Sequence, residues 1–597
     1  MRRTSPSRAS VLGIAVACAA LILTGADRKK KDVPPKVNET IGDVATIFGS
    51  EVKVEGVGLL LGLDGTGSEP APSWQQRKLV DEMQKAGIPH PDKFLKSANR
   101  TLVIVRATIP AGMTAKDKFD VEIELPPASG TTSLAGGWLV QTRLAQRVAT
   151  KEGDKDDKVI AAAVGPVLIG SAARPTDPKI GRVLGGGHVL QDAPYLLSIR
   201  EVRRSGKTSQ LLENVVKQRF HETVDGSSKG MAEAKTDSAL VLHVPKTYHH
   251  NQTRYHQVVL YLSLIDNPAL REQRLQEWGK DLLDPKKAGI AAIKLEGLGP
   301  VAGPVLKQAF TSPDETVRFF AAEALAYLND GDSAAILYEV ARKKPEFRSH
   351  ALKAMSAMDQ AASLLKLRAL MNEPEPELRY GAFNALRTLD PTDPFLGKLR
   401  VLDELPEPEE KDEMAFPIEG QPRPKARPRP EEPFALYVVD CEGPPMIHVS
   451  RKLRCEVVVF GKGQKMLTPI VLGAGGPLLL NASDGDDRVQ ISKITSKNLD
   501  LPRARVNSSL EIAEIIREMA NLGASYPQIA TALGDAWIQK NLPGPFVVDA
   551  VPVDNLAYNA AQIVSLVPGK KDGEVQKTGA EQKRTGLLER FGKMIGR

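Results

Sequence analysis

The pattern of apolar and polar positions changes several times along the chain, and each change indicates a different kind of structure. Residues 41–65 begin with apolar residues at helical spacing, pass two interrupting glycines, and end in an apolar run that stops at Asp64 and Gly65. This pattern predicts a short amphipathic turn, a loop and a buried strand. Other segments have the period of a strand (residues 101–109, 119–125, 159–170 and 239–244) or of a helix (residues 74–86 and 208–220). The mixture favours an α+β fold for residues 41–265.

Residues 281–400 have a different character, because one sequence frame recurs in them. The frame at residues 313–325 returns at 374–386, with further copies at 347–355 and, in degenerate form, at 288–295. A unit of about 30 residues with helical spacing is typical of an α-solenoid, in which each helix pair buries one face against the next pair. We expect about four such units, similar to short HEAT repeats, forming a curved rod with outer faces free to bind protein.

The last third of the chain begins with a linker and then returns to short elements. Residues 403–433 are rich in proline and charge, which predicts an extended linker. Strands are then expected at residues 436–439, 455–460 and 466–472, and helices at 510–521 and 527–539. The first of these helices should end before Gly523. Residues 568–597 are rich in Lys, Glu and Gly, and we expect a disordered charged tail.

Composition places the chain among exported globular proteins. Its 597 residues are too many for one core, and 42% hydrophobic and 26% charged residues are ordinary for a globular protein. Arginines before an apolar run and small residues at 24–26 predict an export signal over residues 1–26, followed by a disordered lead at 27–40.

The net charge of +7 lies in clusters without interleaved aromatic residues. This argues against nucleic-acid binding and leaves solvated linkers or an acidic envelope polymer as the counterpart.

Two cysteines remain once the signal is removed. Cys441 and Cys455 lie in two adjacent apolar segments that we expect to be neighbouring strands, in a compartment that permits oxidation. A disulfide closing this short loop would stabilise the protein by roughly 3 kcal/mol in the chain-entropy model. Two unpaired buried thiols are the alternative.

Candidate chemistry is sparse. His249, His250 and His256 lack the spacing and the companion ligands of a metal site, so a solvated loop is the better interpretation. The loop at residues 62–68 has no Lys-Ser/Thr after its glycines, so it favours a turn with positive φ over a phosphate cradle. No catalytic constellation stands out, and we expect neither an enzyme nor a cofactor.

Residues 38–265 carry several short motifs in a fixed order, at Asp43, at residues 62–67, at Asp120 and at residues 133–137. These motifs resemble those of the flagellar basal-body P-ring protein family. The family's opening "I-x-D-[IV]-A" and its strand ending "GL-[DN]-GTG" are matched through Asp43 and through Gly62, Leu63, Asp64, Gly65, Thr66 and Gly67. Its "G-x-x-[IF]-D-V-x-[IV]" and "S-L-x-GG-x-L" motifs are matched through Asp120 and through Ser133, Leu134, Gly136 and Gly137. A "G-A-x-[IV]-E-R" motif of the family is not legible. The helices near Gly523 are similar to the family's last elements, so the resemblance also covers residues 435–550.

The resemblance implies a division of the chain and a function. The expected parts are the signal (1–26), the lead (27–40), a P-ring-like N-terminal region (41–265), HEAT-like repeats (281–400), the linker (403–433), a P-ring-like C-terminal region (434–567) and the tail (568–597). The resemblance implies a periplasmic, self-assembling subunit that surrounds the flagellar rod at the peptidoglycan layer, next to the outer-membrane ring protein. The repeats, which the family does not normally carry, would bind an unknown partner. An exported scaffold that forms no ring is the alternative, and an envelope hydrolase is the third hypothesis.

Overall fold

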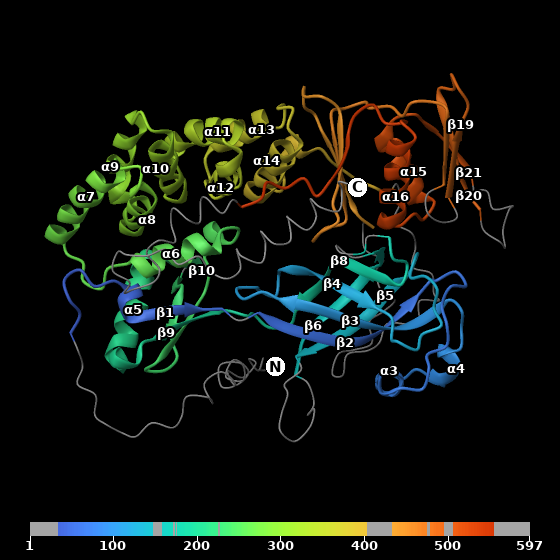
Figure 1. Ribbon diagram of the computed structural model, residues 1–597, viewed down its shortest axis with the longest axis horizontal. Helices are drawn as coiled ribbons and strands as arrows, with labels where there is room; N and C mark the ends of the chain where they lie inside the picture. The colour runs from blue at the N-terminus through green and yellow to red at the C-terminus, as the bar shows by residue number, and fades with distance from the viewer. Residues whose placement is uncertain are drawn as a thin grey trace, which may run out of the picture.

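The computed structural model describes residues 34–49, 51–146, 158–170, 174, 176–224, 227–402, 433–473, 478–494 and 505–554. These residues form a mixed α+β structure arranged in two tiers, which confirms the predicted fold class (Figure 1). One tier holds two larger N-terminal sheets, a two-stranded hairpin of β10 (His221–Val224) and β11 (Ser227–Gly230), and their helices. The other holds a row of helices that runs into the C-terminal sheets. The predicted export signal, residues 403–432 of the linker and the charged tail lie outside the described residues.

A four-stranded antiparallel sheet occupies one end of the N-terminal tier. Its strands follow the order β1 (Ala45–Phe48), β9 (Tyr195–Ile199), β13 (Ala239–Leu242) and β12 (Ala232–Ala234). The one-turn helix α2 (Ile41–Val44) leads into β1, and the sheet packs against α5 (Gly206–Arg219) and α6 (Gln252–Tyr261). Helix α5 begins at Ser205, whose side chain accepts a hydrogen bond from the backbone N–H of Thr208 and so satisfies one free donor of the first turn.

A second, larger sheet closes on itself. Its order is β4-β3-β2-β5-β6-β8-β7, and a further pairing of β4 with β8 joins the two sides. The strands are β2 (Val52–Leu61), β3 (Arg100–Ile109), β4 (Lys118–Glu124), β5 (Trp138–Gln146), β6 (Lys158–Pro166), β7 (Leu168–Ile169) and β8 (Ile180–Val189). Alternate residues of β4 (Phe119, Val121 and Ile123) are buried inside it. Outside, α3 (Trp74–Lys85) packs through Leu79 and Met83, with α4 (Pro91–Leu95) beside it.

The helices of the second tier form two rows. Their bounds are α7 (Pro268–Leu282), α8 (Ala288–Leu298), α9 (Gly303–Gln308), α10 (Glu315–Tyr327), α11 (Ala334–Lys343), α12 (Pro345–Ser356), α13 (Ala361–Leu370) and α14 (Pro376–Leu389). Helices α8, α10, α12 and α14 pack in series, while α11 packs against α13 in the other row. All four copies of the predicted frame fall on the first row. The helices of that row are buried on most sides, so their sequences are more constrained than those of the other row.

Two sheets and two helices make up the C-terminal part. The first sheet has the order β14 (Lys398–Leu399), β15 (Ala435–Val439), β17 (Glu456–Phe460), β16 (Met446–Val449) and β22 (Phe546–Val548). The second is an antiparallel meander of β18 (Ile470–Gly473), β19 (Leu478–Ala482), β20 (Arg488–Lys493) and β21 (Arg505–Ser509). Helices α15 (Ile512–Asn521) and α16 (Tyr526–Ile538) pack beside it.

One hydrophobic core runs through both tiers. It begins at Ile41 in α2, continues through Phe320 and Phe383 in the helical row, and reaches Phe460 in β17. The helical row therefore shares its core with the N-terminal sheet on one side and with the C-terminal sheet on the other. Among the described residues, none of the helices has both the length and the apolar character needed to cross a bilayer.

Residues 34–40, the end of the predicted lead, have defined contacts although none of them is buried: the side chain of Glu39 pairs with Arg203, and the carbonyl of Val37 accepts from Arg274. The structure corrects one strand prediction here. The strand expected at 466–472 is shorter, because β18 starts only at Ile470. Before it, the backbone N–H of Leu467 bonds to the carbonyl of Asn541 instead of to a neighbouring strand.

Candidate functional site

The two glycine-rich motifs of the N-terminal region meet as interlocked loops at one end of the closed sheet. The hydroxyl of Thr66 donates to the carbonyls of Leu63 and Ser133, both at 2.8 Å, and the backbone N–H of Thr132 donates to the carbonyl of Thr66 at 3.0 Å. The motif side chains of Leu63 and Leu134 are completely buried. We call this structure, residues 62–67 with 132–137, the loop clamp.

Glycine is required in the loop clamp for two physical reasons. Gly62, Gly65 and Gly136 have φ of +81°, +85° and +75°, a region that side-chain-bearing residues rarely adopt. At Gly67 the reason is space, because a Cβ atom would lie 2.3 Å from the carbonyl oxygen of Arg100. The prediction of a positive-φ loop is confirmed, and Asp64 shares this conformation with φ of +39°.

The two motif aspartates fix chain segments through backbone N–H groups. Asp43 accepts from the N–H and the hydroxyl of Thr40, at 2.8 and 2.9 Å, and so caps α2. Asp120 accepts from the N–H of Gly185 at 2.7 Å and from the N–H of Leu453 at 2.9 Å. Because Leu453 belongs to the C-terminal part, Asp120 joins the closed sheet to a segment 333 residues away in the chain.

A buried ion network joins the N-terminal tier to the helical row. Arg254 in α6 donates to Glu296 in α8 at 2.6 Å and pairs with Glu323 in α10 at 2.6 Å. The three side chains are 0–1% exposed. Tyr248 completes the network by donating its hydroxyl to Glu296 at 2.6 Å, and burial beside this carboxylate raises the pKa of Tyr248. Charges at this depth persist only when paired, so the network fixes α6 against the first repeats.

A second buried network joins the other end of the helical row to the C-terminal sheet. Glu456 in β17, 1% exposed, pairs with Arg387 of α14 and accepts from the hydroxyl of Tyr380 in the same helix. Ser450 donates to the same carboxylate at 3.2 Å. Burial acts to raise the pKa of Glu456, but the charge of Arg387 and the hydrogen bonds outweigh it, so the pKa lies below its ordinary value.

The predicted disulfide is not formed, and strand direction explains why. Cys441 and Cys455 are both free thiols. Strands β15 and β17 are neighbours, as expected, but they run parallel, with Ala435 opposite Glu456 and Val439 opposite Phe460. Cys455 therefore lies at the start of the pair and Cys441 beyond its end. Burial raises the pKa of Cys455 to about 12, while the Cys441 sulfur lies 3.2 Å from Arg379 Nη2.

The three histidines singled out in the sequence have different surroundings: His250 is exposed just before α6, whereas His256 lies within that helix and is half-buried. His249 Nε2 lies 3.0 Å from Asp117 Oδ1. The ring of His256 packs edge-on against Tyr195, and burial lowers the pKa of His256 to about 4. Over the part of the chain that the structure describes, His, Cys, Asp and Glu side chains form no group of three or more that could hold a metal ion.

Sequence reasoning missed both buried ion networks. The signal was clearest at Glu323, which interrupts the apolar run of residues 319–327, whereas Glu296 follows Lys294 and Glu456 stands at the start of its apolar run. A lone carboxylate in such a segment needs a buried cation as its partner. Nothing in the local sequence, however, points to Arg254 or Arg387 as the cation.

Comparison with known proteins identifies two regions. Residues 40–270 match the model of the family described as flagellar P-ring protein, and residues 303–387 match HEAT repeats. These matches confirm the predicted resemblance and the repeat type. The family match ends at residue 270, so the resemblance of residues 435–550 stays a prediction.

Relatives carry the same description. The chain is 28% identical to the flagellar P-ring protein of Aquifex aeolicus over 222 residues, which is 35% of this chain and 57% of the relative. It is 32% identical to that of Thermotoga maritima over 166 residues, 26% of this chain and 46% of the relative. For Bdellovibrio bacteriovorus the identity is 30% over 163 residues, 27% of this chain and 45% of the relative. The chain thus spans about half the length of the curated relatives that it matches.

Proposed function

We propose that this chain, which carries a flagellar P-ring protein region over residues 40–270, is a structural subunit of a P ring in the flagellar basal body. It assembles with copies of itself around the distal rod, in the periplasm at the peptidoglycan layer, and acts as a bushing for rotation. The outer-membrane ring protein is its neighbour. The observation that carries the proposal is the coincidence of the family match with a rigid, motif-built framework.

The framework supports a mechanical role in three ways. The loop clamp fixes one end of the closed sheet through hydrogen bonds from the Thr66 hydroxyl and from the backbone N–H of Thr132. Asp120 joins that sheet to the C-terminal part. The two buried ion networks hold the helical row at both ends. A subunit of a bushing must keep its shape under load, and paired buried charges with satisfied hydrogen bonds favour one arrangement over its alternatives.

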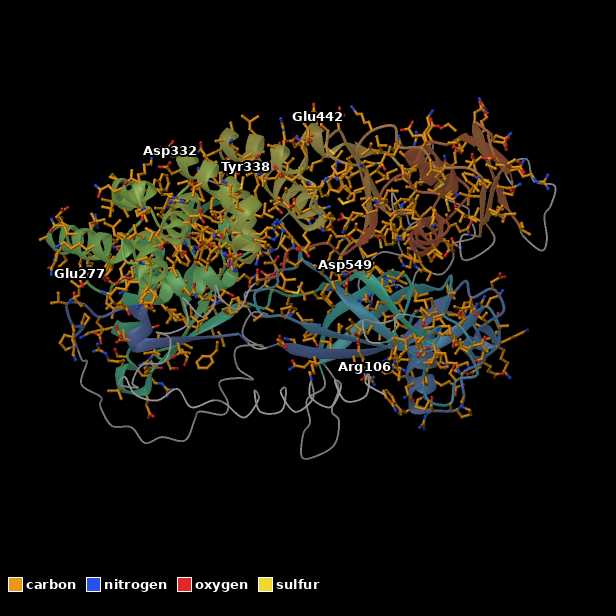
Figure 2. All side chains as sticks on the ribbon, turned by 45° about the horizontal axis from the view of Figure 1, so that its top comes forward. Arg106, Glu277, Asp332, Tyr338, Glu442 and Asp549 are labelled. Atoms are coloured by element: carbon orange, nitrogen blue, oxygen red, sulfur yellow. The ribbon has the colours of Figure 1, made fainter. Side chains whose placement is uncertain are left out.

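A scaffold that recruits a partner through its helical repeats, without forming a ring, is the second candidate. One observation favours it, because the family match covers 231 residues (270 − 40 + 1) and only about half of each relative's length. The second row of helices, which contains α11 and α13, would then present the binding surface. Tyr338, labelled in Figure 2, lies on α11 of that row.

Extraction of basal bodies separates the two candidates. Basal bodies are purified from cells that express the full-length protein with a C-terminal affinity tag, and the protein is quantified against a rod component. Co-purification at a fixed ratio of many copies per rod, together with loss of motility in the deletion strain, supports the ring subunit. A protein that leaves the basal bodies on mild detergent washing, in a strain that swims without it, supports the scaffold and refutes the ring.

A further inference from the structure

A cationic pocket lies where the N-terminal tier meets the first helices of the row. It is a cavity of about 150 Å³ whose walls come from α5, from the end of α6, from α7 and from α8. It lies at the junction of the two regions recognised by comparison, because α5 and α6 belong to the P-ring match while α8 lies between that match and the HEAT match. The volume corresponds to about five water molecules, which suits a small polar ligand.

The pocket is lined by four cationic side chains and by one carboxylate. The cations are Arg219, Arg271, Arg274 and Lys294, and the carboxylate is Asp266. Asp266 pairs with Arg271, and one of its oxygens lies 3.5 Å from Arg274 Nη1. One carboxylate therefore serves two guanidinium groups.

The other cations are held in place by groups that do not neutralise them. Arg219 donates to the backbone carbonyl of Glu296 at 3.0 and 3.2 Å. The ammonium of Lys294 lies 5.5 Å from the ring centre of Tyr261 and 5.7 Å from that of Trp278, which fixes it by cation–π attraction. Carbonyl dipoles and ring faces orient these cations, so the positive charge in the pocket remains available to a ligand.

The buried guanidinium of Arg274 is a second observation that favours an anionic ligand. The residue is 4% exposed, and its Nη2 donates to the carbonyls of Val37 and Ile265, both at 3.0 Å. Its Nη1 is buried and makes no hydrogen bond within the described residues, because Asp266 Oδ1, at 3.5 Å, is an ion-pair partner only. A buried guanidinium N–H without an acceptor is costly, and a bound oxyanion would supply one. Glu277, on the same helix and labelled in Figure 2, does not line the pocket.

We propose that this pocket binds a small anionic group, a phosphate or a carboxylate, held by Arg271, Arg274 and Lys294. Arginine presents paired N–H groups that match the oxygens of either anion, and lysine adds a point charge. The proposal does not depend on ring assembly. The ligand would bind at the junction of the P-ring-like region and the repeats.

The test uses calorimetry on the purified full-length protein, with inorganic phosphate and acetate as probes and sodium chloride at matched ionic strength as the reference. We expect saturable binding of at least one probe, with a dissociation constant of about 0.1–1 mM for a ligand of so few atoms. Tighter phosphate binding would indicate a phosphate ester as the natural ligand, and tighter acetate binding a carboxylate. The indole of Trp278 should report binding by fluorescence, and this signal should vanish in Trp278→Phe while the heat signal remains.

Variants decide whether the pocket is the site. Lys294→Gln should weaken binding about tenfold, and Arg271→Gln with Lys294→Gln about 100-fold. Lys280→Gln, on the exposed part of α7 and outside the pocket lining, is the matched control and should bind as the wild type does. Within the described residues Lys294 forms no ion pair with a carboxylate, so Lys294→Gln tests binding without breaking a salt bridge. Unchanged affinity in both pocket variants, or no saturable binding of either probe, overturns the proposal.

Discussion

Replacing Arg387 by methionine tests the energetic role of the network that joins the repeats to the C-terminal sheet. The change keeps most of the side chain's volume but leaves the carboxylate of Glu456, 1% exposed, without its cation. Removing one partner of a buried ion pair typically costs about 3–5 kcal/mol. Because neither side chain is appreciably solvated, screening does not reduce this value. At neutral pH the junction should open about 150 to 5,000 times more often than in the wild type.

Hydrogen–deuterium exchange measures this opening directly, through the amides of β15 and β17. A double variant, Arg387→Met with Glu456→Gln, is the matched control, because it removes the stranded charge while keeping a hydrogen-bond acceptor for Tyr380. We expect its protection to lie within about 1–2 kcal/mol of the wild type. Equal protection in the single variant and the wild type would refute the reasoning.

The same variant has a predicted pH dependence. In the wild type the folded-state pKa of Glu456 is lowered, so its contribution to stability is present above the unfolded pKa and is lost as the pH falls through the folded pKa. In Arg387→Met the main lowering cause is gone and burial remains, so the folded pKa of Glu456 rises relative to the wild type. Acidification then costs the variant less stability than it costs the wild type, so the deficit of the variant should shrink as the pH falls through the wild-type folded pKa. A deficit that grows on acidification would contradict this account.

Three further outcomes follow from the geometry. Gly67→Ala should destabilise the protein by about 2–3 kcal/mol, because the new Cβ would meet a backbone carbonyl at 2.3 Å. Gly65→Ala, with open space around it, should cost only about 1 kcal/mol. Thermal unfolding of the two variants measures this difference. Asp120→Ala should speed hydrogen exchange at the two amides it accepts from at least about tenfold, and unchanged rates would count against its joining role. The thiol of Cys455, with a pKa of about 12, should alkylate about 1,000-fold more slowly in the native than in the unfolded protein, and a mass two protons lighter would instead reveal a disulfide.

Local elements were predictable because their signals are local. The helices α3, α5, α15 and α16 follow from amphipathic spacing and from caps such as Ser205. The loop clamp was predictable in conformation, since only glycine tolerates the φ of Gly62 and Gly136. The repeat frame located helices α8, α10, α12 and α14, because burial on most sides constrains the sequence of these helices.

Long-range pairing was not predictable from these signals. The apolar pattern of the two segments around Cys441 and Cys455 would be the same in parallel and in antiparallel strands. Strands β15 and β17 run parallel because strand β16, which lies between them in the chain, pairs with β17 in the antiparallel direction. The pairing of β4 with β8, which closes the sheet, leaves no mark in either strand's own pattern. The partner of a buried charge is a third such case, as with Glu456 and Arg387.

The central claim is that this chain builds a ring around the flagellar rod. The most direct measurement is a subtomogram average of the flagellar motor in intact cells, taken from the wild type and from a strain that lacks the gene. The account predicts a ring density at the level of the cell wall in the wild type that disappears in the deletion strain and returns on complementation. A ring of unchanged density in the deletion strain would contradict it.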